Sequence, residues 1–478
     1  MHFSLSLPLL LLLLLALSPA ATVAEDVLGV YIFHRHGDRT AKAWKPVNMT
    51  ALGADQVHSS GAFYRARYVD AGADRPVRRL SPDTAVLSQI AVTAPVDNVL
   101  QNSALVFLQG LYPPSARVEL LANGSRVEAP LDGYQYVPVN SVESAASAAD
   151  SENTAWLQGN SGCTNAEVSS NEYLSSPQYL DTYDSSEAFY TKLSPVINGT
   201  YAKNETNFKN GYAIFDLINV ARIHNTSISS ESLLTESTID ELYSLASIHE
   251  WNLAYNSSEP VRAIAGSVLA GQILESLTPL AERKPGNPIF NIQFGAYGTF
   301  MAFFGLAGLY KTDPDFMGIC DYASSMTFEL VTNATEPTVD DVSVRFYFSN
   351  GTAAENEPTL FPLFGQEETT LSWDDFKTGM AKFAIEDTEH WCGLCGNTDG
   401  TCASSSSNST SSGDDAASNS SSKPDNGVSK PVAGVIGALV TLAVVLGIQA
   451  AVLLFGGLRL VKKSSLAPAQ SAAGGVKA

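Results

Sequence analysis

Five consecutive residues, Arg35-His36-Gly37-Asp38-Arg39, combine side-chain types that can handle a phosphate group. The guanidinium groups of Arg35 and Arg39 can fork onto phosphate oxygens. A neutral imidazole between them can attack phosphorus and hold the phosphoryl group covalently. Gly37 lets the backbone approach closely, and amides of a following helix can add to an anion site. The segment therefore predicts a phosphate site with His36 as its nucleophile.

The alternative interpretation of Arg35-His36-Gly37-Asp38-Arg39 is a charged surface loop without a function, whose sequence arose by chance. Average composition produces an Arg-His-Gly tripeptide in roughly a few per cent of chains of this length. A preceding strand and the second arginine make that interpretation weaker. The neighbouring His34 is interpreted as a core or edge histidine without a role in chemistry.

The surrounding elements place this segment at the edge of a sheet. Residues 27–33 predict a buried strand, and ligands of α/β sheets bind where such strands end. Helical spacing follows at 51–69 and 96–111. Later patterns predict strands at 287–294 and 342–348, and helices at 298–309 and, after a Ser-x-x-Asp start, at 372–385. Helices dominate between these ends, so we predict an α/β core with an inserted, mostly helical subdomain at roughly 115–280.

The stretch VYIFHRHGDRT, with the helix LGADQVHSSGAFYRARYV after it, resembles the histidine acid phosphatases, the branch with secreted acid phosphatases and phytases. Softer matches run through SALVFLQGLYPP, IHEWNLAYNSSEPVRAIAG and IQFGAYGTFMAFFGLAGL to VSVRFYFSNGT and WCGLCG, so the resemblance covers residues 27–395. It implies a phosphoglycerate-mutase-like fold and a phosphomonoester or phosphate as ligand. It also implies that His36 forms a phosphohistidine and that Arg35 and Arg39 bind phosphate.

The second half of the family's site is replaced in this chain. A His-Asp pair normally follows a late strand, where the acid protonates the leaving alcohol. Here Ala296 stands at the histidine position and Tyr297 at the acid position, and a one-residue shift does not restore the pair. The nearest substitute, His249-Glu250, lies well upstream. Tyr297 is interpreted either as a packing residue or as a hydrogen-bond donor whose phenol, with a pKa near about 10, gives up its proton reluctantly.

Two smaller departures accompany this one. The family's third arginine is missing from the stretch at 97–99, which reads Asp-Asn-Val, and Ala41 replaces a frequent proline. A general acid contributes about 10²–10⁴ in rate and a transition-state charge donor about 10²–10³. Two hypotheses follow: a weakly active acid phosphomonoesterase, or a cell-surface pseudophosphatase that binds a phosphorylated or glycan ligand. We expect no cofactor and no metal, and nothing in the sequence selects phytate as substrate.

The two ends of the chain predict a single-pass membrane protein. A leucine-rich run and small residues predict a signal peptide at 1–24, with an uncleaved anchor as the alternative. The apolar run at 431–458 predicts a transmembrane helix, and the basic residues after it place the tail, 459–478, in the cytoplasm. A glycolipid anchor is the alternative, although the chain continues past the run. The ectodomain, 25–402, and a Ser-rich stalk, 403–430, would lie outside, on the plasma membrane or inside a vacuole or other endomembrane compartment.

Composition agrees with an extracellular or lumenal domain. The net charge of -21 argues against a nucleic-acid partner. N-glycans are expected, since there are ten sequons, at Asn48, Asn123, Asn198, Asn204, Asn225, Asn256, Asn333, Asn350, Asn408 and Asn419. The five cysteines favour disulfides over zinc, with one thiol left free or paired with another chain.

Overall fold

The fold is described from a computed structural model of the chain. The structure describes residues 25–142, 162–225 and 232–403. The predicted signal peptide, almost all of the stalk, the transmembrane helix and the cytoplasmic tail lie outside these ranges. Among the described residues, one helical stretch, Pro260–Ala281, is long and apolar enough to cross a bilayer, and 72% of its apolar window is buried inside the protein.

A mixed eight-stranded sheet lies at the core of the described residues, which confirms the predicted α/β class. Its strand order is β10-β8-β7-β1-β6-β2-β5, and β9 pairs with β8. Strands β1, β6, β2 and β5 run parallel, whereas β7, β8, β9 and β10 extend the sheet in antiparallel fashion. The bounds are β1 Asp26–Arg35, β2 Ile90–Pro95, β5 Asn140–Val142, β6 Phe290–Gly295, β7 Ser325–Thr332, β8 Val342–Ser349, β9 Thr359–Phe361 and β10 Thr370–Ser372.

The strand that leads to the candidate site, β1, is buried along nearly its whole length. It lies between β6 and β7, and Val30, Ile32 and Phe33 have no exposed surface. A strand covered on both faces reads as a continuous apolar run rather than as an alternating one. This explains why residues 27–33 carry no polar position.

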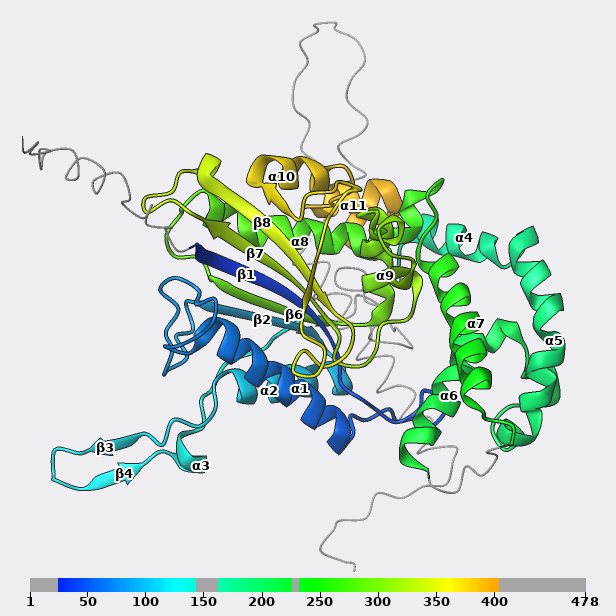
Figure 1. Ribbon diagram of the computed structural model, residues 1–478, viewed down its shortest axis with the longest axis horizontal. Coiled ribbons are helices and arrows are strands. Elements are labelled where there is room, and N and C mark those ends of the chain that lie inside the picture. The colour runs from blue at the N-terminus through cyan, green and yellow to red at the C-terminus, as the bar shows by residue number, and fades with distance from the viewer. Residues whose placement is uncertain (1–24, 143–161, 226–231, 404–478) are drawn as a thin grey trace, which may run out of the picture. The chain divides into compact units, whose positions relative to one another are not determined.

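Helices cover both faces of this sheet. Figure 1 shows α1 (Ala51–Tyr64) and α2 (Asn98–Leu111) on one face, and α8 (Ile264–Ala281) and α10 (Trp373–Ala381) on the other. The predicted Ser-x-x-Asp start is confirmed, since the Ser372 side chain accepts a hydrogen bond from the Asp375 N–H. Further helices are α3 (Pro130–Gly133), α9 (Tyr297–Leu306) and α11 (Thr388–Cys395), and α1 continues as a π-helical turn, Arg65–Val69.

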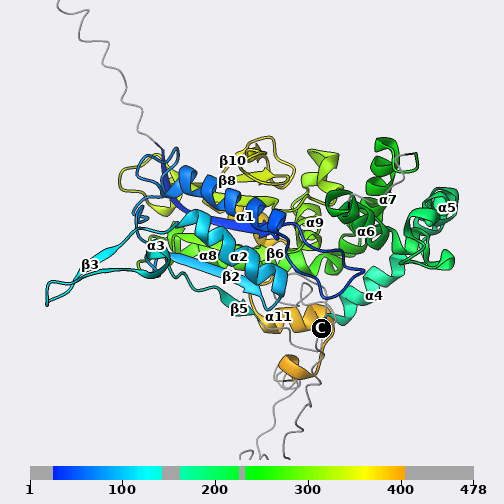
Figure 2. The same cartoon turned by 90° about the horizontal axis from the view of Figure 1, so that it is seen from below.

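Four helices form a separate group beside the sheet, drawn in cyan to green in Figures 1 and 2: α4 (Thr164–Tyr173), α5 (Pro177–Ile197), α6 (Gly211–His224) and α7 (Glu236–Ala254). Their buried apolar side chains make a cluster of their own. The sequence analysis assigned α8 to the helical insert as well, but α8 packs against β1 and shares the core of the sheet. The pair β3 (Val118–Leu120) and β4 (Arg126–Glu128) forms an exposed hairpin that extends away from the sheet (Figure 2).

The cysteines form two disulfides, Cys163–Cys395 and Cys392–Cys402. The first joins the start of α4 to α11. Cys320 is a buried, unpaired thiol, so disulfides are confirmed as the main use of the cysteines. Among the residues that the structure describes, no cluster of His, Cys, Asp and Glu is suited to a metal ion.

Candidate active site

The ends of two parallel strands bring the two predicted half-sites together. In the β1–β6 pairing, Arg35 lies opposite Gly295. His36 therefore leaves the sheet beside Ala296, although 260 positions separate them in the sequence. Ala296 is the N-cap residue of α9 and brings no polar side-chain group, and Tyr297 is the first residue of that helix.

Gly37 is required by a close approach between backbones. A Cβ atom at this position would lie 2.2 Å from the carbonyl oxygen of Gly53, in the first turn of α1. A Cβ on Gly53 would in turn lie 2.0 Å from the Asp38 carbonyl oxygen. The two glycines let the start of α1 pack directly on the loop after β1.

His36 is fully buried, and its hydrogen bond selects its tautomer. The imidazole Nδ1 lies 2.8 Å from the carbonyl oxygen of Gly37. Because a carbonyl can only accept, Nδ1 carries the hydrogen and the lone pair of the neutral ring is on Nε2. The imidazole thus has the form that a nucleophile at Nε2 requires.

Arg35 is held between two tyrosine rings. Its guanidinium carbon lies 4.5 Å from the Tyr322 ring centroid and 5.3 Å from that of Tyr297. Its Nη1 donates to the carbonyl oxygen of Cys320, and its Nε has no hydrogen-bond partner within the described residues. Arg35 is 4% exposed, so it is a rigid buried cation with donors left for a ligand.

Arg39 is held much more completely. Asp216, from α6, contacts both ends of its guanidinium, at 2.9 Å from Nη2 and 3.3 Å from Nη1. Nη1 also donates to the Thr40 carbonyl oxygen at 3.0 Å, and Nη2 donates to the Tyr212 hydroxyl at 3.2 Å. These partners account for the four N–H groups on the terminal nitrogens. The arrangement differs from the open phosphate clamp that the sequence implies.

Tyr297 has an acidic partner from the helical group. Its hydroxyl donates to Glu250 of α7 at 2.7 Å, and the second oxygen of that carboxylate is 2.8 Å from His249 Nδ1. Burial, the charge of Glu250, and hydrogen bonds to Glu250 and Tyr212 raise the pKa of Tyr297 well above its ordinary value. Tyr297 therefore stays protonated. His249-Glu250 is the upstream pair that the sequence analysis considered as a substitute for His-Asp. Its Glu250 contacts Tyr297, which stands at the position of the family's acid.

Two other polar residues near the site have structural contacts. Asp38 accepts from Thr50 at 2.5 Å and pairs with His224 Nε2 at 2.6 Å, which links the loop to the end of α6. His34 is enclosed by Phe107 and Phe294, and burial lowers its pKa to about 4. His34 is thus a neutral core histidine, as expected.

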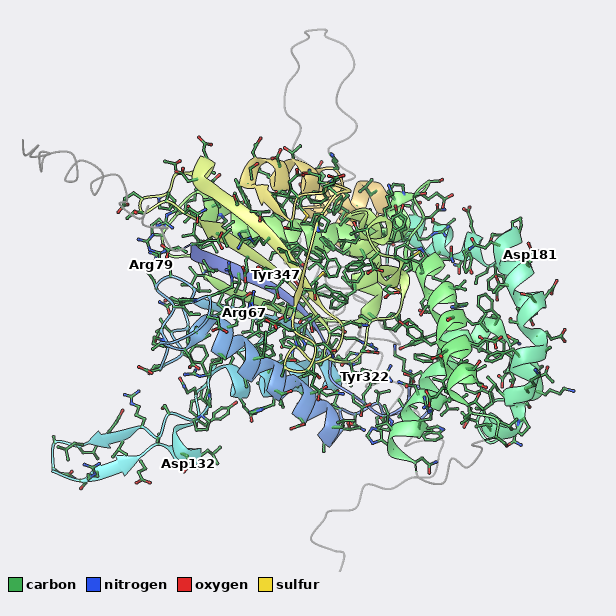
Figure 3. All side chains as sticks on the ribbon, in the orientation of Figure 1. Arg67, Arg79, Asp132, Asp181, Tyr322 and Tyr347 are labelled. Carbon is green, nitrogen blue, oxygen red and sulfur yellow. A yellow bond between two sulfur atoms is a disulfide. The ribbon has the colours of Figure 1, made fainter. Side chains whose placement is uncertain are left out.

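Tyr322, like Asp216, is a residue of the site that the sequence did not reveal. It precedes β7, and Figure 3 shows it where the central strands end, on the side of α6. Its ring centroid is 5.6 Å from that of His36, and 5.8 Å from the guanidinium carbon of Arg39. With the Arg35 contact, one ring therefore touches all three predicted residues, which shows that they converge.

The comparisons with known proteins agree with this geometry. The sequence profile of the histidine phosphatase superfamily (branch 2) matches residues 43–349. The chain belongs to this superfamily. The match begins after Arg39, so it is independent of the Arg-His-Gly segment that led the sequence analysis to the same family. No curated protein matches the sequence.

Solved structures of the superfamily share the fold. Hafnia alvei phytase with tartrate bound is 12% identical with a TM-score of 0.51, over 79% of this chain and 99% of its own. Citrobacter braakii phytase is 14% identical with a TM-score of 0.52, over 77% and 99%. The phytase from D. castellii is 13% identical with a TM-score of 0.51, over 80% and 84%. At these identities the likeness establishes the fold of the superfamily and not the substrate.

Proposed function

We propose that this protein is a membrane-anchored phosphomonoesterase of the histidine acid phosphatase type, with a slow phosphohistidine mechanism at His36. The observation that carries the proposal is the Nδ1 hydrogen bond of His36 to Gly37, beside the buried Arg35. Nε2 attacks the phosphorus of a small phosphomonoester, and the bond from phosphorus to the alcohol oxygen breaks. Arg35 binds the phosphoryl oxygens as charge shifts onto them.

The proton for the leaving alcohol comes from Tyr297 in this proposal. Its phenol, which in the resting site donates to the Glu250 carboxylate, passes its proton to the alcohol oxygen and becomes a phenolate. Water then attacks the phosphohistidine and returns a proton to the phenolate, the bond from phosphorus to Nε2 breaks, and inorganic phosphate leaves. Because a buried phenol is a reluctant acid, we expect turnover up to about 100-fold below that of a site with a well-placed carboxylic acid.

The proposal also places the catalytic domain on the extracellular or lumenal side of a membrane. Eight sequons fall within the described residues, and the acceptor asparagine is exposed at seven of them: Asn48, Asn123, Asn198, Asn204, Asn225, Asn333 and Asn350. Exposed acceptors and two disulfides suit a glycosylated domain in an oxidising compartment. We propose a type I topology, with the catalytic domain on the cell surface or in an endomembrane lumen.

A second candidate is a pseudophosphatase that binds a phosphorylated or glycan ligand without hydrolysing it. The pairing of Arg39 with Asp216 favours it, since this arginine is already neutralised. The assay compares wild type with His36→Ala on p-nitrophenyl phosphate at mildly acidic pH. Hydrolysis that disappears in the variant, with an acid-labile phosphohistidine trapped in wild type, supports the enzyme. Equal traces from both proteins would refute the enzyme and leave the pseudophosphatase as the candidate.

A further inference from the structure

We infer that Asp216 acts as a built-in anion that takes the place of phosphate on Arg39 and so limits the site to weak phosphate binding through Arg35. The inference rests on the proposed phosphate site. It concerns affinity for the anion and not the chemical step. It applies to the phosphatase and to the pseudophosphatase alike.

The contacts of Arg39 carry the first step. A guanidinium has five N–H donors, and it binds phosphate best through a fork of two. The fork between Nη1 and Nη2 faces the two carboxylate oxygens of Asp216. The second N–H of Nη1 donates to the Thr40 carbonyl oxygen, and the second N–H of Nη2 donates to the Tyr212 hydroxyl. A phosphate that approaches Arg39 from this end must displace the carboxylate.

The burial of the pair carries the second step. The side chain of Arg39 is 0% exposed and that of Asp216 is 3% exposed, so solvent screens the attraction poorly. Asp216 is also fixed from another direction, because it accepts from the Lys42 N–H at 2.8 Å. The carboxylate is therefore held in place and cannot turn away without losing a second hydrogen bond. A buried ion pair of this kind is costly to open.

The charges around the site carry the third step. Arg39 and Asp216 cancel, and Glu250 places a further negative charge at the Tyr297 hydroxyl. Arg35 contacts neutral groups, two tyrosine rings and a carbonyl oxygen, and the Lys42 ammonium lies 5.7 Å from the ring centroid of Tyr212. Asp216 therefore cancels one of the positive charges that a phosphate dianion would otherwise meet.

Asp216→Asn tests the inference because it keeps the shape and removes the charge. The probe is inorganic phosphate, titrated by calorimetry against the full-length protein in detergent. Release of one charged donor pair predicts affinity about tenfold or more above wild type. Tyr212→Phe is the matched control: it also releases an N–H of Arg39 but leaves the charge of Asp216, so we expect affinity within about threefold of wild type.

A double variant covers the case in which Asp216→Asn, with an unpaired buried arginine, does not fold. Arg39→Gln/Asp216→Asn replaces the ion pair by two amides that can still hydrogen-bond. We expect phosphate affinity within about threefold of wild type, since the pair adds no net charge. A loss of tenfold or more, or weaker binding by Asp216→Asn, would mean that Asp216 orients Arg39 for phosphate, and would overturn the inference but keep the proposed site. No phosphate binding by any of these proteins would overturn both.

Discussion

Replacement of Tyr297 by phenylalanine would separate proton donation from phosphate binding. The change removes one O–H, which donates to Glu250 at 2.7 Å, and keeps the ring that lies 5.3 Å from the Arg35 guanidinium. Glu250 keeps its contact with His249 at 2.8 Å, so its carboxylate is not left unpaired. We therefore expect the variant to fold, with a loss of about 1–2 kcal/mol in the free energy of unfolding.

The size of the kinetic effect depends on the leaving group. An alkyl alcohol must receive a proton as it leaves, whereas p-nitrophenolate is stable without one. A positioned acid contributes about 10²–10⁴ in rate, and a buried phenol belongs at the low end of that range. For Tyr297→Phe we expect kcat to fall about 100-fold on glycerol 2-phosphate and less than about threefold on p-nitrophenyl phosphate.

The assay measures kcat for both substrates with wild type, Tyr297→Phe and Tyr322→Phe. Tyr322 is the matched control, because its ring lies against the same arginine at 4.5 Å and its hydroxyl is assigned no proton transfer. We expect Tyr322→Phe to change kcat by the same factor on both substrates. An equal loss on both substrates in Tyr297→Phe would refute proton donation by this phenol and leave it as a packing residue.

Three other predictions follow from the same structure. Arg35→Gln should weaken binding of inorganic phosphate about 10–100-fold in calorimetry, since it removes a buried charged donor, and unchanged affinity would contradict its role. Burial lowers the pKa of His34 to about 4 from 6.5, so the folded state keeps this ring neutral while the unfolded chain takes up a proton. Its stabilising contribution is present above pH 6.5 and is lost as pH falls to about 4, roughly 3 kcal/mol in all; urea unfolding of His34→Gln should show a smaller decline over that range. Cys163→Ser/Cys395→Ser removes the link between α4 and α11 and should lower the free energy of unfolding by about 2–5 kcal/mol, and reduction of wild type, which also opens Cys392–Cys402, should lower it at least as much.

The sequence predicted the parts of the fold whose signals are local. The apolar run of β1, the cap at Ser372 and the helical spacing of α2 lie within short windows, and each element is present in the structure. Strand β7 was missed for a physical reason. Its centre carries Glu329, a charge that breaks the apolar pattern, and only the fold shows that Arg67 and Arg75 neutralise it.

About half of the candidate site could be predicted from the sequence. The family resemblance implied that His36 and the position of Ala296 belong to one site, and the pairing of β1 with β6 places both at one edge of the sheet. Asp216 and Tyr322 could not be found, since an aspartate within a helix or a tyrosine in a loop has no pattern that sets it apart. The ion pair of Arg39 joins positions 39 and 216, which no spacing rule connects.

In the proposed site, the inserted helices contribute charged groups that the sheet edge lacks. The sheet edge supplies His36, Arg35 and Tyr297, whereas α6 supplies Asp216 and α7 supplies Glu250. Tyr297→Asp, which introduces the acid typical of the family, would remove the phenol and place a new carboxylate beside Glu250. Two like charges at one buried position raise the pKa of one of them, or keep the pair apart. We therefore expect that a substitution at the sheet edge alone would not give this site a family-like general acid.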